Sequence, residues 1–280
     1  MQWRGLRQSS NVEDRRGRGP AKIALGGGLG TLVVVLIVWL LGGNPAQFLN
    51  LTDNPEATGT SAELPANDTL SQFVSVVLAE TEDVWTKIFE TTGMDYRQPK
   101  LVLYSDQIQS ACGFSSAASG PFYCPGDEKV YLDLSFFREM QTQLGASGDF
   151  ALAYVVAHEV GHHVQKLTGR LDEVNRLRGK TTEKEFNKIM VRLELQADYY
   201  AGIWAHYADK WKHIVETGDL DEAIRAAGAV GDDRLQKQSQ GYIVPDSFTH
   251  GTSEQRMNWF MKGYQSGNSS VVDPFKENSL

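Results

Sequence analysis

The sequence contains little cysteine and no internal repeat or long low-complexity tract. Two cysteines among 280 residues exclude a scaffold that depends on many disulfide bonds. The lack of a repeat excludes a solenoid. An apolar content of 41% and a charged content of 22% are ordinary for globular proteins, so we expect a hydrophobic core in one large domain or two small ones.

Charged residues are missing from positions 23–44, where an apolar run of nineteen residues, Ile23–Leu41, occurs. As a helix this run would be about 28 Å long, which is close to the hydrocarbon thickness of a bilayer. Trp39 lies near one end, where an aromatic ring favours the membrane interface. We interpret residues 23–43 as an uncleaved transmembrane anchor. The alternatives are a buried core helix and a cleaved signal peptide, since small residues follow the run.

Basic residues are concentrated before the apolar run. Residues 1–22 contain six basic and two acidic side chains, a balance of +4, and the rest of the chain has a balance of −12. The positive-inside rule places this basic head in the cytoplasm and the bulk of a single-pass protein outside it. Residues 44–66 are rich in Pro, Thr, Asn and Gly and are interpreted as a flexible tether. The acidic body argues against nucleic acid as a partner.

Residues 67–280 are expected to form an α+β domain that is mostly helical and contains a small sheet. Apolar residues recur there at intervals of three and four, which is typical of helices that bury one face. Two short segments with β-branched and aromatic residues, 99–104 and 129–134, are predicted strands. The predicted helices are 67–93, with a break near Thr81, and 149–167, 182–212, 220–229 and 253–264.

The only two cysteines, Cys112 and Cys124, enclose a loop rich in glycine, serine and proline. In a chain exported to an oxidising compartment they would most simply form a disulfide bond that closes this loop. Free thiols and a two-cysteine zinc site are the alternatives, and the zinc site lacks a nearby histidine or third cysteine as a partner. We therefore predict the disulfide bond.

The predicted helix at 149–167 contains His158, Glu159 and His162 in a His-Glu-x-x-His pattern. Residues four apart lie on the same helix face, so the two histidines can present imidazole nitrogens to one Zn²⁺ ion. Glu159 would then lie beside the metal as a general base. Chance produces this pattern in about one chain of this length in a hundred, so other residues must support it.

The next long helix supplies candidate partners for the two histidines, because Glu194 and Asp198 are also four residues apart. The inner side of that helix is otherwise apolar, and a buried carboxylate requires a metal ion or a basic partner. The spacing from His162 to Glu194 allows the two helices to pack side by side. Alternatively, both carboxylates belong to a solvated face and pair with Arg192 or with nearby lysines.

Together these motifs resemble those of the gluzincin metallopeptidases, in which His-Glu-x-x-His is followed by Glu-x-x-x-Asp on the next helix. More closely, the chain resembles the bacterial family of putative neutral zinc metallopeptidases. The resemblance extends over nearly the whole chain and is carried by Trp3–Arg16, Gly120–Pro125, Ala157–Gln165, Glu194–Asp198, Gly231–Arg234 and Phe248–Ser253. It implies a zincin-like fold, a zinc cofactor and Glu194 as the third ligand. Asp198 would accept a hydrogen bond from the free ring N–H of a ligand histidine.

Peptide hydrolysis also requires a donor for the oxyanion that forms in the tetrahedral intermediate. His250 is the candidate, because related gluzincins are similar in having a late histidine that is followed six residues on by an arginine, here Arg256. Arg256 would support the same transition state. The alternative for His250 is a structural role in the core or at the start of the last helix.

We expect a membrane-anchored zinc peptidase of the bacterial inner membrane whose catalytic domain is periplasmic or otherwise extracytoplasmic. Glu159 would take a proton from a zinc-activated water and deliver it to the leaving amine. The partners would be protein or peptide substrates, and Val130–Leu134 could offer a strand edge to an extended substrate. The alternatives are a zinc-binding scaffold protein without proteolytic turnover and an inert helical membrane protein with a chance motif.

Overall fold

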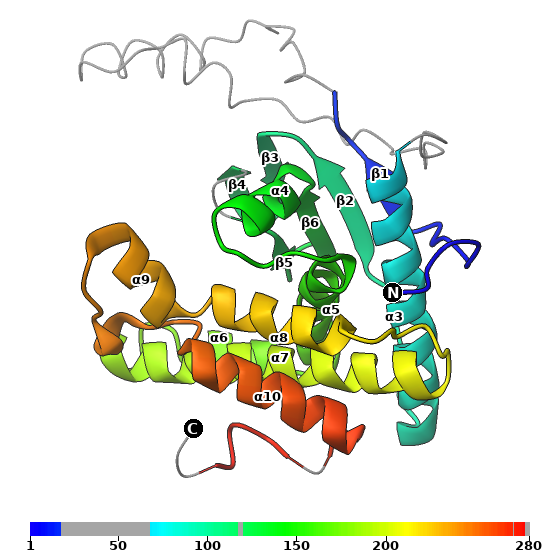
Figure 1. Ribbon diagram of the computed structural model, residues 1–280. Coiled ribbons are helices and arrows are strands. Elements are labelled where there is room, and N and C mark those ends of the chain that lie inside the picture. Colours follow the sequence, from blue (N-terminus) through cyan, green and yellow to red (C-terminus); the bar gives the residue numbers. More distant parts are fainter. Residues whose placement is uncertain (18–67, 117–119, 271, 278–280) are drawn as a thin grey trace, which may run out of the picture.

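The computed structural model describes residues 1–17, 68–116, 120–270 and 272–277 (Figure 1). The predicted anchor at 23–43 and the predicted tether at 44–66 lie outside these residues. Within the described part of the chain, no helix combines the length and the apolar character that a bilayer span requires. The described residues form a mostly helical α+β fold with a small mixed sheet, as the sequence predicts.

A four-stranded sheet has the strand order β1-β2-β6-β5. β1, β2 and β6 are parallel, whereas β5 pairs antiparallel with β6 and forms one edge of the sheet. A separate antiparallel hairpin contains β3 and β4. The strands are β1 (Val12–Asp14), β2 (Lys100–Tyr104), β3 (Gln107–Ser110), β4 (Gly113–Ser116), β5 (Phe122–Cys124) and β6 (Lys129–Asp133).

The two strands expected from the sequence are confirmed as β2 and β6. The suggestion that Val130–Leu134 offers a free edge to a substrate is wrong, because β6 lies between β2 and β5 and pairs with both. The free edge on that side of the sheet belongs to β5.

Helices form the larger part of the fold (Figure 1). The predicted helices correspond to α3, α5, α7, α8 and α10, whereas α4, α6 and α9 were not predicted. Their bounds are α3 (Thr69–Thr92), α4 (Ser135–Thr142), α5 (Asp149–Leu167), α6 (Arg170–Asn175), α7 (Glu183–Lys210), α8 (Asp219–Ala229), α9 (Asp232–Gln240) and α10 (Ser253–Ser266), with a short 3₁₀ turn η2 (Pro245–Ser247).

α3 is continuous, so the predicted break near Thr81 is wrong. Thr81 is buried, and its hydroxyl donates a hydrogen bond to the carbonyl of Leu78 in the preceding turn. A threonine satisfied in this way remains compatible with a helix. The carboxylate of Asp68 caps the start of α3, and Gly93 ends the helix in the left-handed conformation.

α5 runs through the middle of the core. It packs against α3, α7 and α8 and against β5 and β6, and its residues from Phe150 to Gly161 are all buried. A helix enclosed on all sides is apolar all round, so every polar residue on it must find a partner inside the protein. The polar residues of α5 therefore mark the positions where the core contains hydrogen bonds or ion pairs as well as apolar contacts.

Residues 1–17 belong to the domain and do not form a separate head. β1 extends the sheet, with Val12 opposite Leu101 of β2. The ring of Trp3 packs edge to face on that of Phe73 in α3, with centroids 5.4 Å apart. The sequence signal for β1 was weak because this strand has only three residues.

Basic and polar residues of this N-terminal segment satisfy acids of the domain. The buried carboxylate of Glu82 in α3 accepts hydrogen bonds from Arg7, Ser9 and Asn11. Charges that the sequence assigned to a cytoplasmic head are thus used in contacts with the domain itself.

The pairing of β1 with β2 also bears on membrane topology. Strands of one sheet lie on the same side of any membrane, whereas a single span between residues 17 and 68 would separate them. A cytoplasmic location of the basic head together with an external location of the domain therefore does not agree with this pairing.

We predict that the N-terminal segment and the domain are labelled from the same side of the membrane. The test introduces a single cysteine at exposed Ser10 or at exposed Lys180 and treats intact cells that express the full chain with a membrane-impermeant maleimide. Both variants should be modified equally, or both protected, before lysis. Labelling of only one of the two positions would contradict the packing of residues 1–17 on the domain.

Candidate metal centre

α5 and α7 cross closely at Gly161. A Cβ atom at this position would lie 3.0 Å from the carbonyl oxygen and 3.1 Å from the Cα atom of Ala197. Any larger residue would push the two helices apart, since real Cβ atoms rarely come so close to backbone atoms. The crossing places Glu194, about one turn before Ala197, against the face of α5 that carries His158 and His162.

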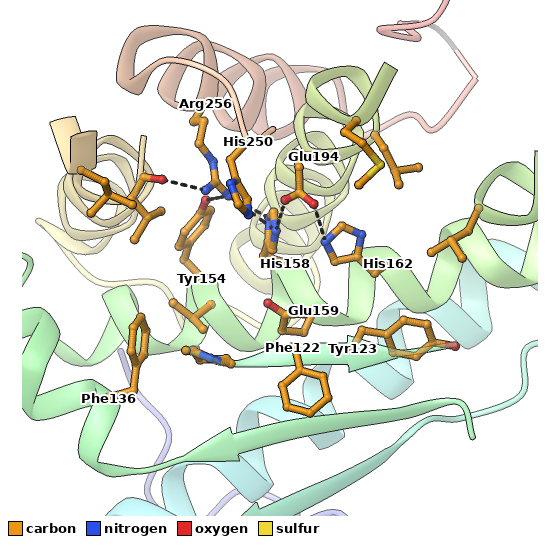
Figure 2. A pocket seen from close by; sticks show the side chains of 18 of the residues that line it. Phe122, Tyr123, Phe136, Tyr154, His158, Glu159, His162, Glu194, His250 and Arg256 are labelled. Atoms are coloured by element: carbon orange, nitrogen blue, oxygen red, sulfur yellow. Dashed lines mark hydrogen bonds and ion pairs between the residues drawn. The ribbon is translucent and has the colours of Figure 1, made fainter. Parts of the chain in front are cut away.

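The two histidines and Glu194 converge on one point (Figure 2). The Nε2 atom of His158 lies 3.2 Å from one carboxylate oxygen of Glu194, and the Nε2 atom of His162 lies 3.5 Å from the other. One ligand atom from each residue falls within 4.8 Å of the others, as required of groups that could share a metal ion. This arrangement confirms that the predicted residues come together in the fold.

The orientation of both rings fits a metal ion. The Nδ1 atom of His158 is 2.8 Å from Asp198, and the Nδ1 atom of His162 is 2.9 Å from the side-chain oxygen of Gln165. Both acceptors take a hydrogen bond from Nδ1 and so turn the Nε2 atoms toward Glu194, which leaves Nε2 as the nitrogen that a metal ion could bind. Two imidazoles and one carboxylate are the protein ligands of many catalytic zinc sites, which keep a further position open.

Asp198 contacts more than His158. It is fully buried and also accepts hydrogen bonds from the hydroxyl of Tyr154, at 2.5 Å, and from the guanidinium of Arg256, at 2.8 and 3.0 Å. Asp198 thus lies beside His158, and its support of a metal-bound histidine stays a prediction. Arg256 lies in the same network, where its charge faces Asp198; its support of a transition state stays a prediction.

The charged groups around His158 shift one another's pKa values. Burial raises the pKa of Asp198, but the neighbouring Arg256 and His158 outweigh this effect and hold the pKa well below its ordinary value. Burial lowers the pKa of His158, yet Asp198 and Glu194 raise it to about 10 overall. Without a metal ion, the cluster therefore attracts protons to its histidines, and a cation that binds there must compete with them.

Glu159 lies next to the cluster at a cleft of about 640 Å³, which His158, His162 and Glu194 also line. It is 8% exposed, and among the described residues it has no side-chain hydrogen-bond partner. Figure 2 shows it on the side of the cluster that faces β5, near Phe122. A carboxylate in this position can receive a proton from a water molecule in the cleft.

His250 reaches the same cleft from the segment before α10. Its Nδ1 atom is 3.1 Å from one oxygen of Asp232, and the other oxygen accepts hydrogen bonds from the backbone N–H groups of Thr249, His250 and Gly251. Burial lowers the pKa of His250, while Asp232 and Glu194 raise it, and the net shift is upward. Gly251 has a φ of +95°, which glycine adopts readily.

The comparisons with known proteins agree with this geometry. Residues 1–275 match the family described as "Putative neutral zinc metallopeptidase". This chain belongs to that family. A protein of Escherichia coli (strain K12), "Uncharacterized protein YpfJ", is 48% identical over 284 residues, which cover 98% of this chain and 99% of the relative. "Uncharacterized protein Rv2575" of Mycobacterium tuberculosis is 40% identical over 221 residues, or 75% and 73% of the two chains. No solved structure matches.

In this zinc metallopeptidase family member, several contacts at the site were not predicted, nor were the residues Asp232, Tyr154 and Gln165. Asp232 fixes His250, Tyr154 and Arg256 surround Asp198, and Gln165 contacts His162. Asp232 and Gln165 lie inside stretches that carry the family resemblance, and this location was the only sequence feature that could have drawn attention to them. Their partners are distant in sequence or, for Gln165, on the same helix, so helical spacing alone did not identify their roles.

The other histidines do not join the metal centre, as expected. His163 points away from it and lies 3.0 Å from the hydroxyl of Tyr123 on β5 and close to the carbonyl of Arg97. This contact connects α5 to the edge strand β5. His206 is buried and contacts the carbonyl of Tyr264, which is a packing role.

A second acidic group, Asp149, Asp219 and Glu222, has the proximity required of metal ligands. The ammonium group of Met1 lies 3.0 Å from Asp149 and 3.2 Å from Asp219, and Glu222 accepts a hydrogen bond from the backbone of Phe150. A cation from the chain itself thus occupies this position.

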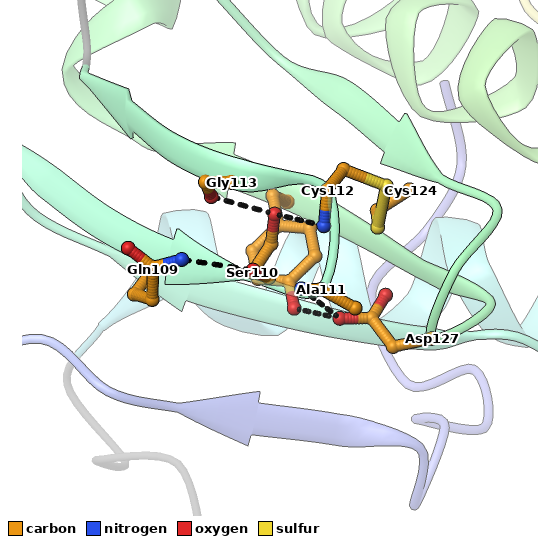
Figure 3. The surroundings of a disulfide bond; sticks show 8 residues. Gln109, Ser110, Ala111, Cys112, Gly113, Cys124 and Asp127 are labelled. Atoms are coloured by element: carbon orange, nitrogen blue, oxygen red, sulfur yellow. Dashed lines mark hydrogen bonds between the residues drawn. A yellow bond between two sulfur atoms is a disulfide. The ribbon is translucent and has the colours of Figure 1, made fainter. Parts of the chain in front are cut away.

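The predicted disulfide bond between Cys112 and Cys124 is present (Figure 3). It joins the turn between β3 and β4 to the end of β5, and the carboxylate of Asp127 accepts a hydrogen bond from the adjacent backbone N–H of Ala111. Because β5 borders the cleft, the bond restrains the strand on which part of the cleft wall is built.

We predict that Asp198→Ala lowers the free energy of unfolding by about 3–5 kcal/mol, because it leaves the buried guanidinium of Arg256 without its carboxylate. The measurement is urea denaturation of the metal-free protein. Asp172→Ala, which removes an exposed carboxylate paired with Lys166, serves as the control and should change stability by less than about 1 kcal/mol. An equal loss in both variants would contradict the network around Asp198.

Proposed function

We propose that this protein is a zinc-dependent peptidase that hydrolyses peptide bonds of extracytoplasmic proteins or peptides. The observation that supports this most strongly is the convergence of His158, His162 and Glu194 beside a carboxylate, Glu159, that faces an open cleft. Membership of the family supports the same reading, because its description names a zinc metallopeptidase.

Zinc held by these three side chains would supply a Lewis acid that lowers the pKa of a water molecule and polarises a peptide carbonyl. Glu159 accepts the proton of the attacking water and passes it to the nitrogen of the leaving amine. Its position on α5, next to His158, keeps the carboxylate close to the point where the ligand atoms meet. Its partial burial restricts the number of water molecules that compete for it.

His250, which lines the cleft, would donate a hydrogen bond to the negative charge that develops on the carbonyl oxygen. Asp232 accepts from its Nδ1 atom, which leaves the Nε2–H to point into the cleft. A histidine that is held protonated by a carboxylate is a better donor to an oxyanion than a neutral ring. The raised pKa of His250 agrees with this role.

The cleft favours an extended peptide with apolar side chains. Phe122 and Phe136 line it on the side of the sheet, and Met190 and Leu193 of α7 line it on the other side. The edge of β5 borders the same cleft and can pair with the backbone of a substrate in the manner of an added strand. Residues 122–124 of β5 therefore replace Val130–Leu134 as the proposed docking edge.

We also propose that the whole described body, residues 1–17 included, lies outside the cytoplasm of a bacterial cell. The disulfide bond supports this location, because such bonds persist in oxidising compartments. The apolar run at 23–41 remains a predicted membrane attachment. The labelling of residues 10 and 180 described above reports which side the body occupies.

We predict that Glu159→Gln keeps one zinc ion per chain but lowers peptide hydrolysis by at least about 100-fold, because the amide cannot accept the water proton. Zinc content and cleavage of a broad peptide library are measured on purified full-length protein. Removal of zinc with a chelator should abolish cleavage by the wild type, and zinc should restore it.

Glu90→Gln, an exposed change on α3, is the matched control and should cleave like the wild type. Undiminished turnover by Glu159→Gln would show that Glu159 is not the base. A zinc-loaded wild type that cleaves no peptide would support a scaffold protein that binds zinc without turnover.

A further inference from the structure

A chain of buried hydrogen bonds leads from the metal centre to the C-terminal segment. The Nδ1 atom of His162 lies 2.9 Å from Oε1 of Gln165. Nε2 of Gln165 lies 3.1 Å from Oε1 of Gln196 on α7, and Nε2 of Gln196 lies 3.2 Å from Asp273. Both glutamines are buried. Four side chains from α5, α7 and the C-terminal segment are therefore connected in sequence.

The direction of the chain is fixed at Gln165. Its Nε2 atom also donates to the backbone carbonyl of Leu193 at 2.7 Å, and a carbonyl oxygen can only accept. The amide nitrogen must therefore face Leu193 and Gln196, and Oε1 must face His162. It follows that His162 donates from Nδ1, so that Nε2 is the nitrogen available to a metal ion.

The other end of the chain is a carboxylate. Because Gln165 donates to Oε1 of Gln196, the Nε2 atom of Gln196 faces Asp273 and donates to it. Asp273 also forms an ion pair with the guanidinium of Arg170 at 3.1 Å. Each side chain in the series thus donates to the next one, and the last acceptor is the carboxylate of Asp273. Hydrogen bonds arranged in this way polarise one another.

Several contacts hold Asp273 in place. Arg192 donates to the backbone carbonyls of Pro274 and Glu277, and the guanidinium of Arg170 lies over the ring of Phe275, 4.4 Å from its centroid. The backbone N–H of Phe275 donates to Asp273. The position of the carboxylate is therefore set by the C-terminal segment as a whole.

We propose that the C-terminal segment, residues 273–277, positions the metal ligand His162. Asp273 acts through Gln196 and Gln165 to hold the proton on Nδ1 and to fix the ring. His158 receives the same support directly from Asp198. Two carboxylates thus orient the two histidines of α5. Asp198 contacts His158 directly, and Asp273 acts on His162 through the two glutamines. The inference rests on the metal centre of the proposed function but does not require peptidase activity.

The first test observes the Nδ1 proton of His162 by ¹H–¹⁵N NMR in metal-free, full-length protein labelled with ¹⁵N-histidine. A slowly exchanging Nδ1 proton is expected in the wild type. Gln165→Leu should lose this protected signal, and Asp273→Asn should exchange the proton several times faster. Asp172→Asn, which changes an exposed acid on the neighbouring α6, should leave the signal unchanged.

The second test measures zinc affinity by competition with a chromophoric chelator. Loss of a partner that orients a metal-bound histidine lowers affinity by about 10–100-fold, so Gln165→Leu should fall in this range and Asp273→Asn at its lower end. Asp172→Asn should bind zinc within about twofold of the wild type. Circular dichroism identifies any variant that fails to fold, and Asp273→Asn, which keeps the side-chain shape, serves as the milder change.

Asp273→Asn with wild-type proton exchange and wild-type zinc affinity would overturn the proposal, even if Gln165→Leu showed both effects. A wild type that binds no zinc would instead refute the proposed function. The proton-exchange measurement would then still decide whether Asp273 orients His162, because it uses the metal-free protein.

Discussion

The close crossing of α5 and α7 is the constraint on which the rest of the site depends. Gly161 and Ala197 allow the two backbones to approach, and the buried carboxylates of Glu194 and Asp198 then lie close to α5. Two buried carboxylates are costly unless cations compensate them. Arg256 compensates Asp198, while Glu194 lies against the imidazoles of His158 and His162. A divalent cation bound between His158, His162 and Glu194 would offset the charge of Glu194.

The same crossing explains why the surrounding residues are polar. Once His158 and His162 direct Nε2 at a common point, each ring has an Nδ1–H that is buried and requires an acceptor. Asp198 and Gln165 supply the two acceptors, and each in turn needs partners, which are Arg256, Tyr154 and Gln196. The polar network extends outward from the crossing until it reaches charged residues near the surface.

Much of the fold followed from the sequence because its long helices have clear periodicity. The predicted bounds of α5 agree with the structure, and those of α7 differ by one or two residues at each end; a Thr182–Glu185 capping box begins α7. The basic residues of the N-terminal segment fit the positive-inside rule, and the sequence contains no pattern that reveals their pairing with the domain. Only tertiary contacts, such as those of Arg7 with Glu82, show that these charges belong to the domain. Short elements such as β1 and α6 carry too few residues for a periodic signal.

The site was predictable where chemistry depends on spacing along one helix. His158, Glu159 and His162, and likewise Glu194 and Asp198, are fixed by helical geometry once the helices are known. Asp232, Tyr154 and the pair of glutamines act across the fold, and a hydrogen bond between residues far apart in sequence leaves no pattern in the chain. The role of Gln165 was harder still to predict, because no sequence pattern shows which residue a single buried glutamine will contact.

X-ray diffraction from crystals of the zinc-loaded protein, recorded on both sides of the zinc absorption edge, tests the central claim most directly. We expect one anomalous peak per chain at bonding distance from Nε2 of His158, Nε2 of His162 and the carboxylate of Glu194. A peak at another position, or none under saturating zinc, would contradict this account.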